Sequence, residues 1–509
     1  MLSTEPPAQH HGTNDLHHWI GGRKVRGTSG RYGDVTDPAT GRVSARVPLA
    51  SAEEAAAAIT VAGAAFTMWR NTSLARRTRI LFRFRELLDA RAGDLAEIIT
   101  AEHGKVLSDA AGEVARGQEV VEFSCGAPHL LKGSATMNAS TGVDVSSIRQ
   151  PLGVCAIVSP FNFPAMVPMW FFPIAIAAGN TVVLKPSEKV PTAALWIAEL
   201  WQEAGLPDGV FNVLNGDATA VDALLTSPDV RSVSFVGSTP VARHLYEAGA
   251  AQGKRVQALG GAKNHMVVLP DADLDLAADQ AVNAAFGSAG ERCMAVSALV
   301  AVGDIADALV GRIADRAKVL ETGDGRRSND MGPLVSKAAQ KRVTAYIDAG
   351  EAAGATLVVD GRRANYDADG PGFFVGPTLF DDVTRNMSIY TDEIFGPVLS
   401  VVRVATLDDA IALINSSPYS NGTALFTNDG RAARRFQDEV EVGMIGINVP
   451  VPVPMAYYSF GGWKSSLFGD THAHGMDGFH FFTRGKVVTT RWPEPATRES
   501  ISLHFPTNS

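Results

Sequence analysis

A regular alternation of short apolar runs with stretches of helical length constrains this fold more than any other feature of the sequence. In residues 153–259, apolar runs at 181–184 and 232–236 are separated by helical patterns such as 192–204. A strand, a helix and a second strand in that order form a βαβ unit, and repeated units give a parallel sheet covered by helices. A second series of the same kind occupies residues 265–448. We therefore predict an α/β chain with at least two folded units, which 509 residues of 46% hydrophobic composition can fill.

Segments outside the two series complete the predicted architecture. Ser51 and Glu54 form a capping box ahead of an alanine-rich helix, and Gly104 is expected to end the first helical block. Further helical patterns lie at 76–101, 108–123, 274–288, 337–351 and 407–415. Residues 136–149 and 479–491 are β-rich and stand apart from both series, as two peripheral hairpins would.

Charge and hydropathy argue against several classes of function. The formal charge of −9 and the pI near 5.8 disfavour binding to nucleic acid or to a membrane surface, because both need basic patches. The polar stretch 1–18 has no signal-peptide pattern, and the apolar run 170–178 is too short to span a bilayer. We expect a cytoplasmic enzyme acting on small molecules.

The three cysteines, Cys125, Cys155 and Cys293, have no CxxC spacing, which disfavours a disulfide framework or a zinc site. His472-x-His474 offers only two ligands, so no metal is predicted.

Cys293 is the candidate nucleophile. It lies in Gly-Glu-Arg-Cys-Met-Ala at 290–295, between a glycine turn and Arg292. The thiolate is the reactive form of cysteine, and a neighbouring cation lowers the pKa enough to populate it. The alternative for this hexapeptide alone is a small buried residue beside a surface arginine.

Asn162 is the candidate partner of that nucleophile. The segment Ser-Pro-Phe-Asn-Phe-Pro at 159–164 follows the apolar run 153–158 and precedes another, which predicts a strand, a rigid turn and a helix. An amide fixed in such a turn donates to a developing oxyanion without reorganising. The alternative is an asparagine that bonds only its own turn.

Together, these segments resemble the aldehyde dehydrogenase superfamily over nearly the whole chain, from the Trp19 region to the Arg484 region. Four further segments match in order, at 181–188, 234–239, 392–397 and 459–466. Within the superfamily, Gly-Ala-Lys-Asn-His at 261–265 followed by residues 285–295 is similar to the CoA-acylating methylmalonate-semialdehyde dehydrogenases, as are 446–450 and 454–456.

The resemblance implies an aldehyde dehydrogenase-like fold of two Rossmann-like α/β domains with a β oligomerisation arm, assembled as a homotetramer, a dimer of dimers. The implied division is a NAD-binding domain at 15–131 and 150–261, a catalytic domain at 262–460, the arm at 132–149 and 475–493, and tails at 1–14 and 494–509.

The same resemblance assigns a cofactor site. Lys185 and Glu188, with Lys189 adjacent, match residues that hold the adenosine ribose, and Glu393 matches the glutamate on the nicotinamide ribose. A carboxylate near the 2′-hydroxyl repels a 2′-phosphate, so NAD is predicted over NADP. The small residues at 237–239 start a helix that can receive the pyrophosphate. Further cofactor contacts are expected at Ser159, Phe161, Gly237, Ser238 and Gly260.

One residue of the family pattern is missing. Hydrolytic relatives use the glutamate of Glu-Leu-Gly-Gly-Lys to activate water, whereas this chain reads Leu-Gly-Gly-Ala-Lys at 259–263, so that Leu259 or Ala258 takes the position of the base. Neither abstracts a proton, and loss of a general base slows such a step by about two to four powers of ten. Glu291 is a weak substitute, expected to point away. CoA is therefore the predicted acyl acceptor, and a hydrolytic dehydrogenase is the alternative.

Arg116 and Arg292 match the arginines that bind the substrate carboxylate in this branch. A guanidinium holds a carboxylate bidentately, which selects a 3-oxopropanoate skeleton, although Arg116 alone could equally be an exposed helical charge. Methylmalonate semialdehyde would give propionyl-CoA, and malonate semialdehyde acetyl-CoA. The two substrates differ by one methyl group, worth about 1 kcal/mol, and both they and the pathway, for example valine or inositol breakdown, stay open at this level.

Overall fold

The first predicted βαβ series forms an eight-stranded sheet in the computed structural model, which describes residues 14–364, 366–367 and 370–492. Its strands are β2 (His18–Ile20), β3 (Arg23–Val25), β8 (Val154–Val158), β9 (Thr181–Lys185), β10 (Phe211–Val213), β11 (Val230–Val236), β12 (Arg255–Leu259) and β24 (Leu467–Phe468). They lie in the order β24-β12-β11-β8-β9-β10-β2-β3, and the five from β12 to β10 are parallel. The predicted parallel sheet is confirmed.

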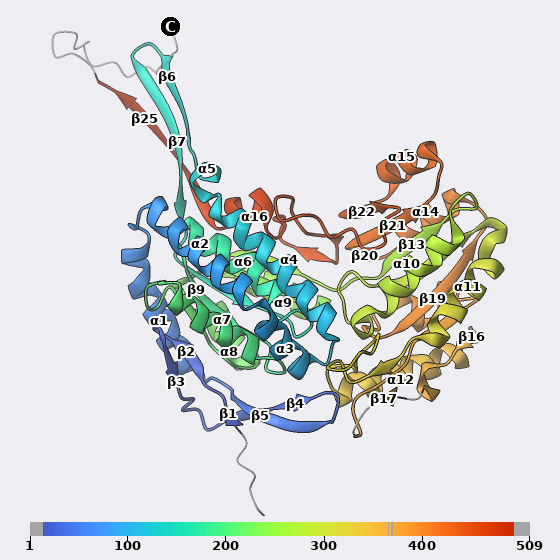
Figure 1. The fold of residues 1–509 in the computed structure, drawn as a ribbon. Coiled ribbons are helices and arrows are strands. Elements are labelled where there is room, and N and C mark those ends of the chain that lie inside the picture. Colours follow the sequence, from blue (N-terminus) through green and yellow to red (C-terminus); the bar gives the residue numbers. More distant parts are fainter. Residues whose placement is uncertain (1–13, 365, 368–369, 493–509) are drawn as a thin grey trace, which may run out of the picture.

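The second series forms a seven-stranded sheet, the core of the other lobe in Figure 1. Its strands are β13 (Asn264–Val268), β14 (Val296–Val302), β16 (Thr356–Val359), β18 (Thr378–Asp381), β19 (Val398–Val404), β21 (Gly422–Phe426) and β22 (Met444–Ile447). The order is β16-β18-β19-β14-β13-β21-β22, with only β16 antiparallel to its neighbour. Helices α10 (Leu274–Phe286), α11 (Ala306–Val319), α12 (Lys337–Ala352), α13 (Ser388–Thr391), α14 (Leu407–Asn415) and α15 (Gly430–Glu439) belong to this lobe.

Helices cover both faces of the first sheet. On one face lie α1 (Ala52–Trp69), α8 (Ala218–Thr226) and α9 (Thr239–Ala251), and on the other α2 (Leu74–Ala90), α3 (Ala92–His103), α4 (Leu107–Cys125), α6 (Met166–Ala178) and α7 (Thr192–Glu203). Both faces are covered because apolar side chains project from both. In β8, Ala156 packs against the first group of helices, and its neighbours Cys155 and Ile157 pack against the second group. The predicted capping box begins α1, and Gly104 ends α3 with a φ of 91°.

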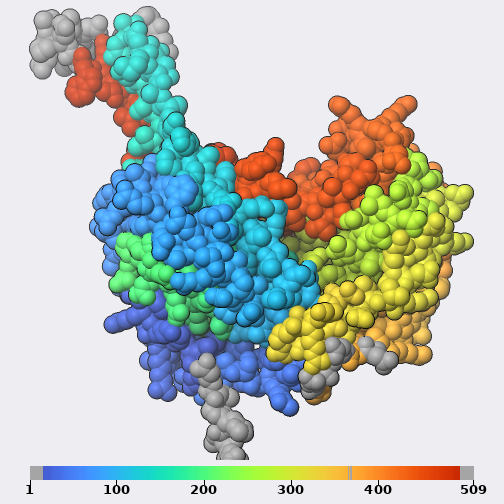
Figure 2. Space-filling model, in the orientation of Figure 1, coloured from blue at the N-terminus to red at the C-terminus, as the bar shows by residue number. Residues whose placement is uncertain are grey.

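A three-stranded sheet forms an arm that projects from the first lobe (Figures 1 and 2). It consists of β6 (Ser134–Ser140), β7 (Val143–Pro151) and β25 (Thr483–Arg491), in the order β25-β7-β6. The β-rich tail predicted from residue 479 begins only at Thr483, because Gly475–Phe481 form helix α16, which packs on α6. The remaining strands and α-helix are β1 (Asn14–Asp15), β4 (Tyr32–Asp37), β5 (Arg42–Pro48), α5 (Ala127–Leu130), β15 (Thr322–Gly323), β17 (Tyr366–Asp367), β20 (Tyr419–Ser420) and β23 (Trp463–Lys464).

The chain between α3 and α4 meets the second lobe backbone to backbone. The Leu107 N–H donates to the Gly325 carbonyl at 3.1 Å. A Cβ on Gly325 would lie 2.5 Å from the Gly104 carbonyl oxygen, and a Cβ on Gly332 would lie 2.0 Å from the same atom. Only glycine permits so close an approach. These contacts fix the first turn of α4 against the second lobe.

Candidate active site

The loop that carries Cys293 follows α10 through a left-handed turn. Ser288 and Ala289 both have φ of 53°, and Gly290 has φ of 70°. The helix predicted for 274–288 therefore ends at Phe286. A Cβ on Gly290 would lie 2.2 Å from the carbonyl oxygen of Gly396, so this glycine is required by space as well as by conformation. The turn places Cys293 just before the start of β14, a central strand of the second sheet.

Cys293, Arg292 and Glu393 line one small cavity, together with Asn264 and Phe395. The sequence predicted a role for the first three of these residues, and the fold brings them together from two separate loops. Arg116 is not among the described residues that line this cavity. The cavity thus combines a thiol, a carboxylate and a guanidinium.

The resting thiol of Cys293 is protonated at neutral pH. Burial, reinforced by the Glu393 carboxylate, raises its pKa to about 12, whereas backbone N–H groups and Arg292 lower it. Arg292 acts in the predicted direction but is outweighed, and its Nη2 is bound to Asp109 Oδ1 at 2.6 Å. Arg292 therefore does not by itself create a thiolate, contrary to the simplest expectation from its neighbouring position.

Asn162 lies in the turn between β8 and α6, as predicted, and its side chain reaches the cysteine loop. Its Nδ2 donates to the carbonyl oxygen of Glu291 at 2.8 Å. A carboxamide has two N–H groups, so one is committed to the loop and a second remains for a ligand. The side chain is buried, which favours a fixed orientation.

A buried ion pair holds the turn that carries Asn162. Lys105 Nζ donates to the carbonyl oxygen of Asn162 at 2.6 Å and to Glu113 Oε2 at 2.7 Å. Glu113 Oε1 accepts the N–H groups of Ala165 and Met166 at 2.8 and 3.1 Å, at the start of α6. The carboxylate thus caps a helix of another segment while it neutralises the ammonium group.

The residues near the expected position of a base are unsuited to that role. Leu259 and Ala258 are buried at the end of β12, and Leu259 belongs to the apolar cluster that includes Met294. Glu291 is buried and accepts the Val335 N–H at 3.2 Å. Its carboxyl group is thus engaged by the Val335 backbone, and burial raises its pKa to about 8.

The predicted cofactor residues follow the carboxyl ends of four adjacent parallel strands. Ser159 follows β8, Lys185 ends β9, Gly237 follows β11 and Gly260 follows β12. Ligands of open α/β sheets bind at this edge. The Ser159 hydroxyl is buried without a protein partner among the described residues, and it is thus a group that a ligand would satisfy.

The individual contacts along this edge fit a dinucleotide. Lys185 Nζ lies 3.3 Å from Glu188 Oε2, and burial lowers the pKa of the lysine. Ser238 is the N-cap of α9 and makes no side-chain cap, which leaves that helix start open to an anion. Glu393 Oε1 accepts the Ala262 N–H at 2.9 Å. Phe161 lies under the Lys189 ammonium group, 5.0 Å from its ring centre.

Arg116 is engaged with protein groups. Its Nη1 binds both carboxylate oxygens of Glu119 at 2.8 and 2.9 Å, and its Nη2 donates to the Pro454 carbonyl at 2.7 Å. In this structure the guanidinium braces the proline-rich loop 449–455. A substrate carboxylate would have to share it.

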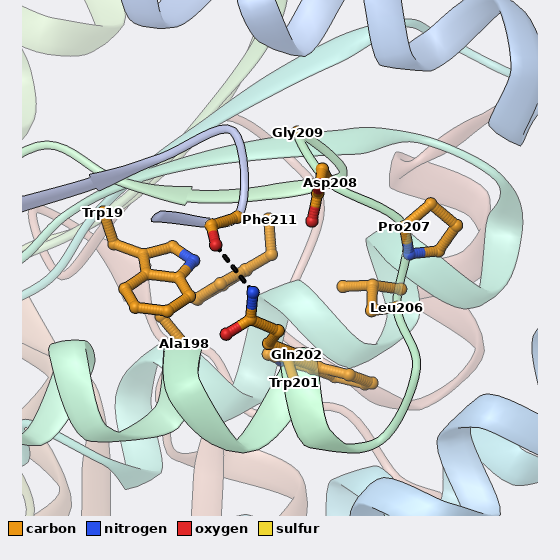
Figure 3. A pocket seen from close by; sticks show the side chains of 10 residues that line it. Trp19, Ala198, Trp201, Gln202, Leu206, Pro207, Asp208, Gly209 and Phe211 are labelled. Atoms are coloured by element: carbon orange, nitrogen blue, oxygen red, sulfur yellow. Dashed lines mark hydrogen bonds between the residues drawn. The ribbon is translucent and has the colours of Figure 1, made fainter. Parts of the chain in front are cut away.

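A second small pocket lies away from these residues, between Trp19 and helix α7 (Figure 3). Gln202 donates to the Gly22 carbonyl at 2.7 Å across it. Its volume of about 10 Å³ is room for a single water molecule. His474, which the sequence offered as half of a possible metal pair, is buried and bonded to the Tyr458 carbonyl at 2.7 Å.

Sequence reasoning missed several residues of the site. Asp109, Lys105 and Glu113 were assigned no role, because the site residues that they contact, Arg292, Asn162 and the start of α6, lie 50 or more positions away in the chain. Asn264 stood inside a matched motif without an assigned role, and Asn421 was not singled out.

No helix of the described part of the chain is long and apolar enough to cross a membrane.

Comparison with known proteins agrees with this geometry. The malonate-semialdehyde dehydrogenase of Pseudomonas aeruginosa is 55% identical over 96% of this chain and 99% of its own length. A malonate-semialdehyde dehydrogenase of Geobacillus kaustophilus is 51% identical over 94% of this chain and 99% of its own.

Solved structures match equally well. The methylmalonate-semialdehyde dehydrogenase of Oceanimonas doudoroffii superposes with a TM-score of 0.94 at 53% identity, over 96% of this chain and 100% of that one. A Sinorhizobium meliloti protein described as a methylmalonate-semialdehyde dehydrogenase, in complex with NAD, gives 0.94 at 50% identity over the same shares. The model of the aldehyde dehydrogenase family matches residues 25–488. This chain therefore belongs to the aldehyde dehydrogenase family.

Proposed function

We propose that this protein catalyses the NAD-dependent, CoA-acylating oxidation of methylmalonate semialdehyde and malonate semialdehyde, to propionyl-CoA and acetyl-CoA, with loss of the substrate carboxylate. The names of relatives about half identical over nearly the full length support the substrate class. The observation that carries the acylating assignment is that Leu259 and Ala258, the two residues that can take the position of the hydrolytic base, are both buried and apolar.

In this proposal, Cys293 attacks the aldehyde carbon after its proton has left, and the oxyanion is held by the free N–H of Asn162 and the N–H of Cys293. Bound NAD would supply the hydride acceptor for this oxidation, after which Cys293 carries the acyl group as a thioester. Lys185, Glu188 and Glu393 would hold the two riboses, and the α9 start with Ser238 the pyrophosphate. Gly237 and Gly260 would let the backbone approach, and Ser159, Phe161 and Lys189 would line the path.

The carboxylate of such a substrate sits β to the new thioester carbonyl. The carbon–carbon bond to it breaks, carbon dioxide leaves, and the electron pair passes into the thioester enolate, which then takes up a proton. The CoA thiolate attacks the shortened thioester and releases Cys293. Because Leu259 and Ala258 cannot activate water and the Glu291 carboxyl points to Val335, hydrolysis competes poorly.

Arg292, and Arg116 if it exchanges a protein partner for substrate, would bind the carboxylate. We expect Arg292→Ala and Arg116→Ala to raise KM for malonate semialdehyde by about tenfold or more, and to leave KM for propanal nearly unchanged. Steady-state kinetics with the two aldehydes decide this. Equal losses for both aldehydes would mean that the arginines only support the fold.

Two further parts of the proposal concern the assembly of the protein and its location in the cell. The arm leaves apolar side chains at its surface: Val487 on β25 is 69% exposed, Trp492 just after that strand is 87% exposed, and Met137 on β6 is 74% exposed. Such a surface suits burial against other copies of the chain, and we propose a homotetramer. Three free cysteines, two of them buried, suit the cytoplasm.

The experiment that tests the function measures NADH formation from methylmalonate semialdehyde and NAD, with and without CoA, and identifies the acyl product. We expect sustained turnover only with CoA, yielding propionyl-CoA. Equally fast turnover without CoA, yielding a free acid, would establish the hydrolytic alternative. Leu259→Glu is the matched variant, expected to introduce CoA-independent turnover.

A further inference from the structure

The carbonyl oxygen of Cys293 is held by two side-chain amides from the second sheet. Asn264, at the start of β13, donates from Nδ2 to this oxygen at 2.9 Å and to the Ala295 carbonyl at 3.0 Å. Asn421, next to β21, donates to the same oxygen at 3.3 Å. Both asparagines are 4% exposed. Two buried amides thus converge on one backbone atom of the nucleophile.

Both amides are themselves fixed. The Gly422 N–H donates to Asn264 Oδ1 at 3.0 Å, which sets the orientation of that carboxamide. Asn421 Nδ2 also lies 3.0 Å from the sulfur of Met294. The pair therefore ties the cysteine loop to two adjacent parallel strands of the sheet, β13 and β21.

The carbonyl of Cys293 and the N–H of Met294 belong to the same peptide group. The N–H groups of Cys293 and Met294 both face the Cys293 sulfur and favour its ionised form. Donors that pull on the carbonyl oxygen polarise the peptide and strengthen its N–H as a donor. They also prevent the peptide from rotating away from the sulfur.

We propose that Asn264 and Asn421 are positioning residues, which hold the Cys293–Met294 peptide with its N–H toward the sulfur and thereby make the thiolate easier to form. This role rests on the proposed function, because it matters only if Cys293 attacks the aldehyde. The charged groups that face the sulfur are Glu393, which opposes ionisation, and Arg292, which favours it. Neither contacts Asn264 or Asn421 through a hydrogen bond given by the structure, so both remain in the variants.

The test is the rate of Cys293 alkylation by iodoacetamide in the full chain without cofactor, measured from neutral to alkaline pH. Leucine is nearly isosteric with asparagine and cannot donate. We expect Asn264→Leu and Asn421→Leu each to slow alkylation at a given pH by about three- to tenfold, with the rate profile displaced to higher pH. Asn421→Gln, which keeps the amide, should recover most of the rate. Mass spectrometry assigns the alkylation to Cys293.

A matched control separates this effect from general destabilisation. Asn212 in β10 of the other sheet accepts the Gly21 N–H and donates to the Val182 and Gly209 carbonyls. Asn212→Leu should lower the unfolding temperature at least as much and leave the alkylation rate at the wild-type value.

Wild-type alkylation rates in both Asn264→Leu and Asn421→Leu would overturn the proposal and leave the amides a purely structural role. If Asn264→Leu does not fold, Asn421→Leu alone decides. This variant loses a longer and weaker hydrogen bond to Cys293, so it should destabilise the fold less. The assay contains no aldehyde, NAD or CoA. A failure of CoA dependence in the functional test would therefore leave this result standing.

Discussion

At the scale of single residues, the left-handed turn before Cys293 makes a prediction about two neighbours. Gly290→Ala places a methyl group 2.2 Å from the Gly396 carbonyl oxygen and should lower the free energy of unfolding by about 2–4 kcal/mol. Ala289→Gly relieves a left-handed alanine and should keep stability or raise it by up to about 1 kcal/mol. Urea unfolding of both variants measures this. Similar losses in the two would show that the turn is not strained at Ala289.

Glu291 predicts a pH dependence of stability. Its pKa is raised from 4.5 to about 8 in the folded chain by burial. Between these values the folded state binds the proton that the unfolded state has released, so stability falls as pH rises, by at most about 1.4 kcal/mol per pH unit, and levels off above pH 8.

The variant Glu291→Gln should remove this contribution and make the fall of stability between pH 5 and pH 8 less steep, within the interval set by the two pKa values. Thermal unfolding in buffers across that range is the measurement. A wild-type slope in the glutamine variant would assign the dependence to another group, with the buried Glu102, whose pKa is about 7, as the first to examine.

At the scale of elements, α4 couples the oxyanion donor to helix α6 through Glu113. Glu113→Gln keeps an acceptor for the Ala165 and Met166 N–H groups but leaves Lys105 charged, buried and without its carboxylate partner. Loss of one partner of a buried pair lowers stability by about 3–5 kcal/mol.

The double variant Lys105→Met/Glu113→Gln should regain part of that stability, since no unpaired charge remains. It should still turn over aldehyde more slowly, with the loss in kcat rather than KM, because the Asn162 carbonyl has lost its brace. Urea unfolding and steady-state kinetics of the two single variants and the double variant form the cycle. Additive losses would mean that the pair does not act as a unit.

Elements were predictable from the sequence where local pattern determines them. Continuous apolar runs identified β8, β9 and β11, and cap residues identified the start of α1 and the end of α3. The pattern at 76–101 ran through a break: the helix ends at Ala90 and restarts at Ala92, because Arg91 leaves the helical region with φ of −124° and ψ of 21°. The aromatic residues at 479–482 were predicted to start a strand. Instead, residues up to Phe481 belong to helix α16, in which Gly478 packs closely against Ile174 on α6.

The candidate site was only partly predictable for a physical reason. Cys293, Asn162 and Lys185 are marked by their own neighbours in sequence, a glycine turn, a proline-braced turn and a strand end. Lys105 and Asn421 act on backbone atoms 57 and 128 positions away, and spacing in the chain carries no signal for such contacts.

At the scale of the whole molecule, the arm predicts the state of assembly. Val487 in β25 lies opposite Ser147 in β7 and is largely exposed. Val487→Lys should convert the proposed tetramer into smaller species, because burying a charged side chain at the interface is unfavourable. Sedimentation velocity measures the change. Val319→Lys, at a similarly exposed valine that ends α11, is the control, and an equal effect of both would remove the arm from the interface.

The glycine contacts between the lobes bear on how halves of such proteins can be exchanged. Gly104 belongs to the first lobe, and Gly325 and Gly332 belong to the second. Positions 325 and 332 must be glycine because a Cβ at either would collide with the Gly104 carbonyl oxygen. A chimera that took one half from this chain and the other from a distant relative would contain the glycines of only one of the two lobes. A chimera should therefore fold only if it contains all three glycines. These residues determine which halves can be combined, although they lie far apart in the sequence.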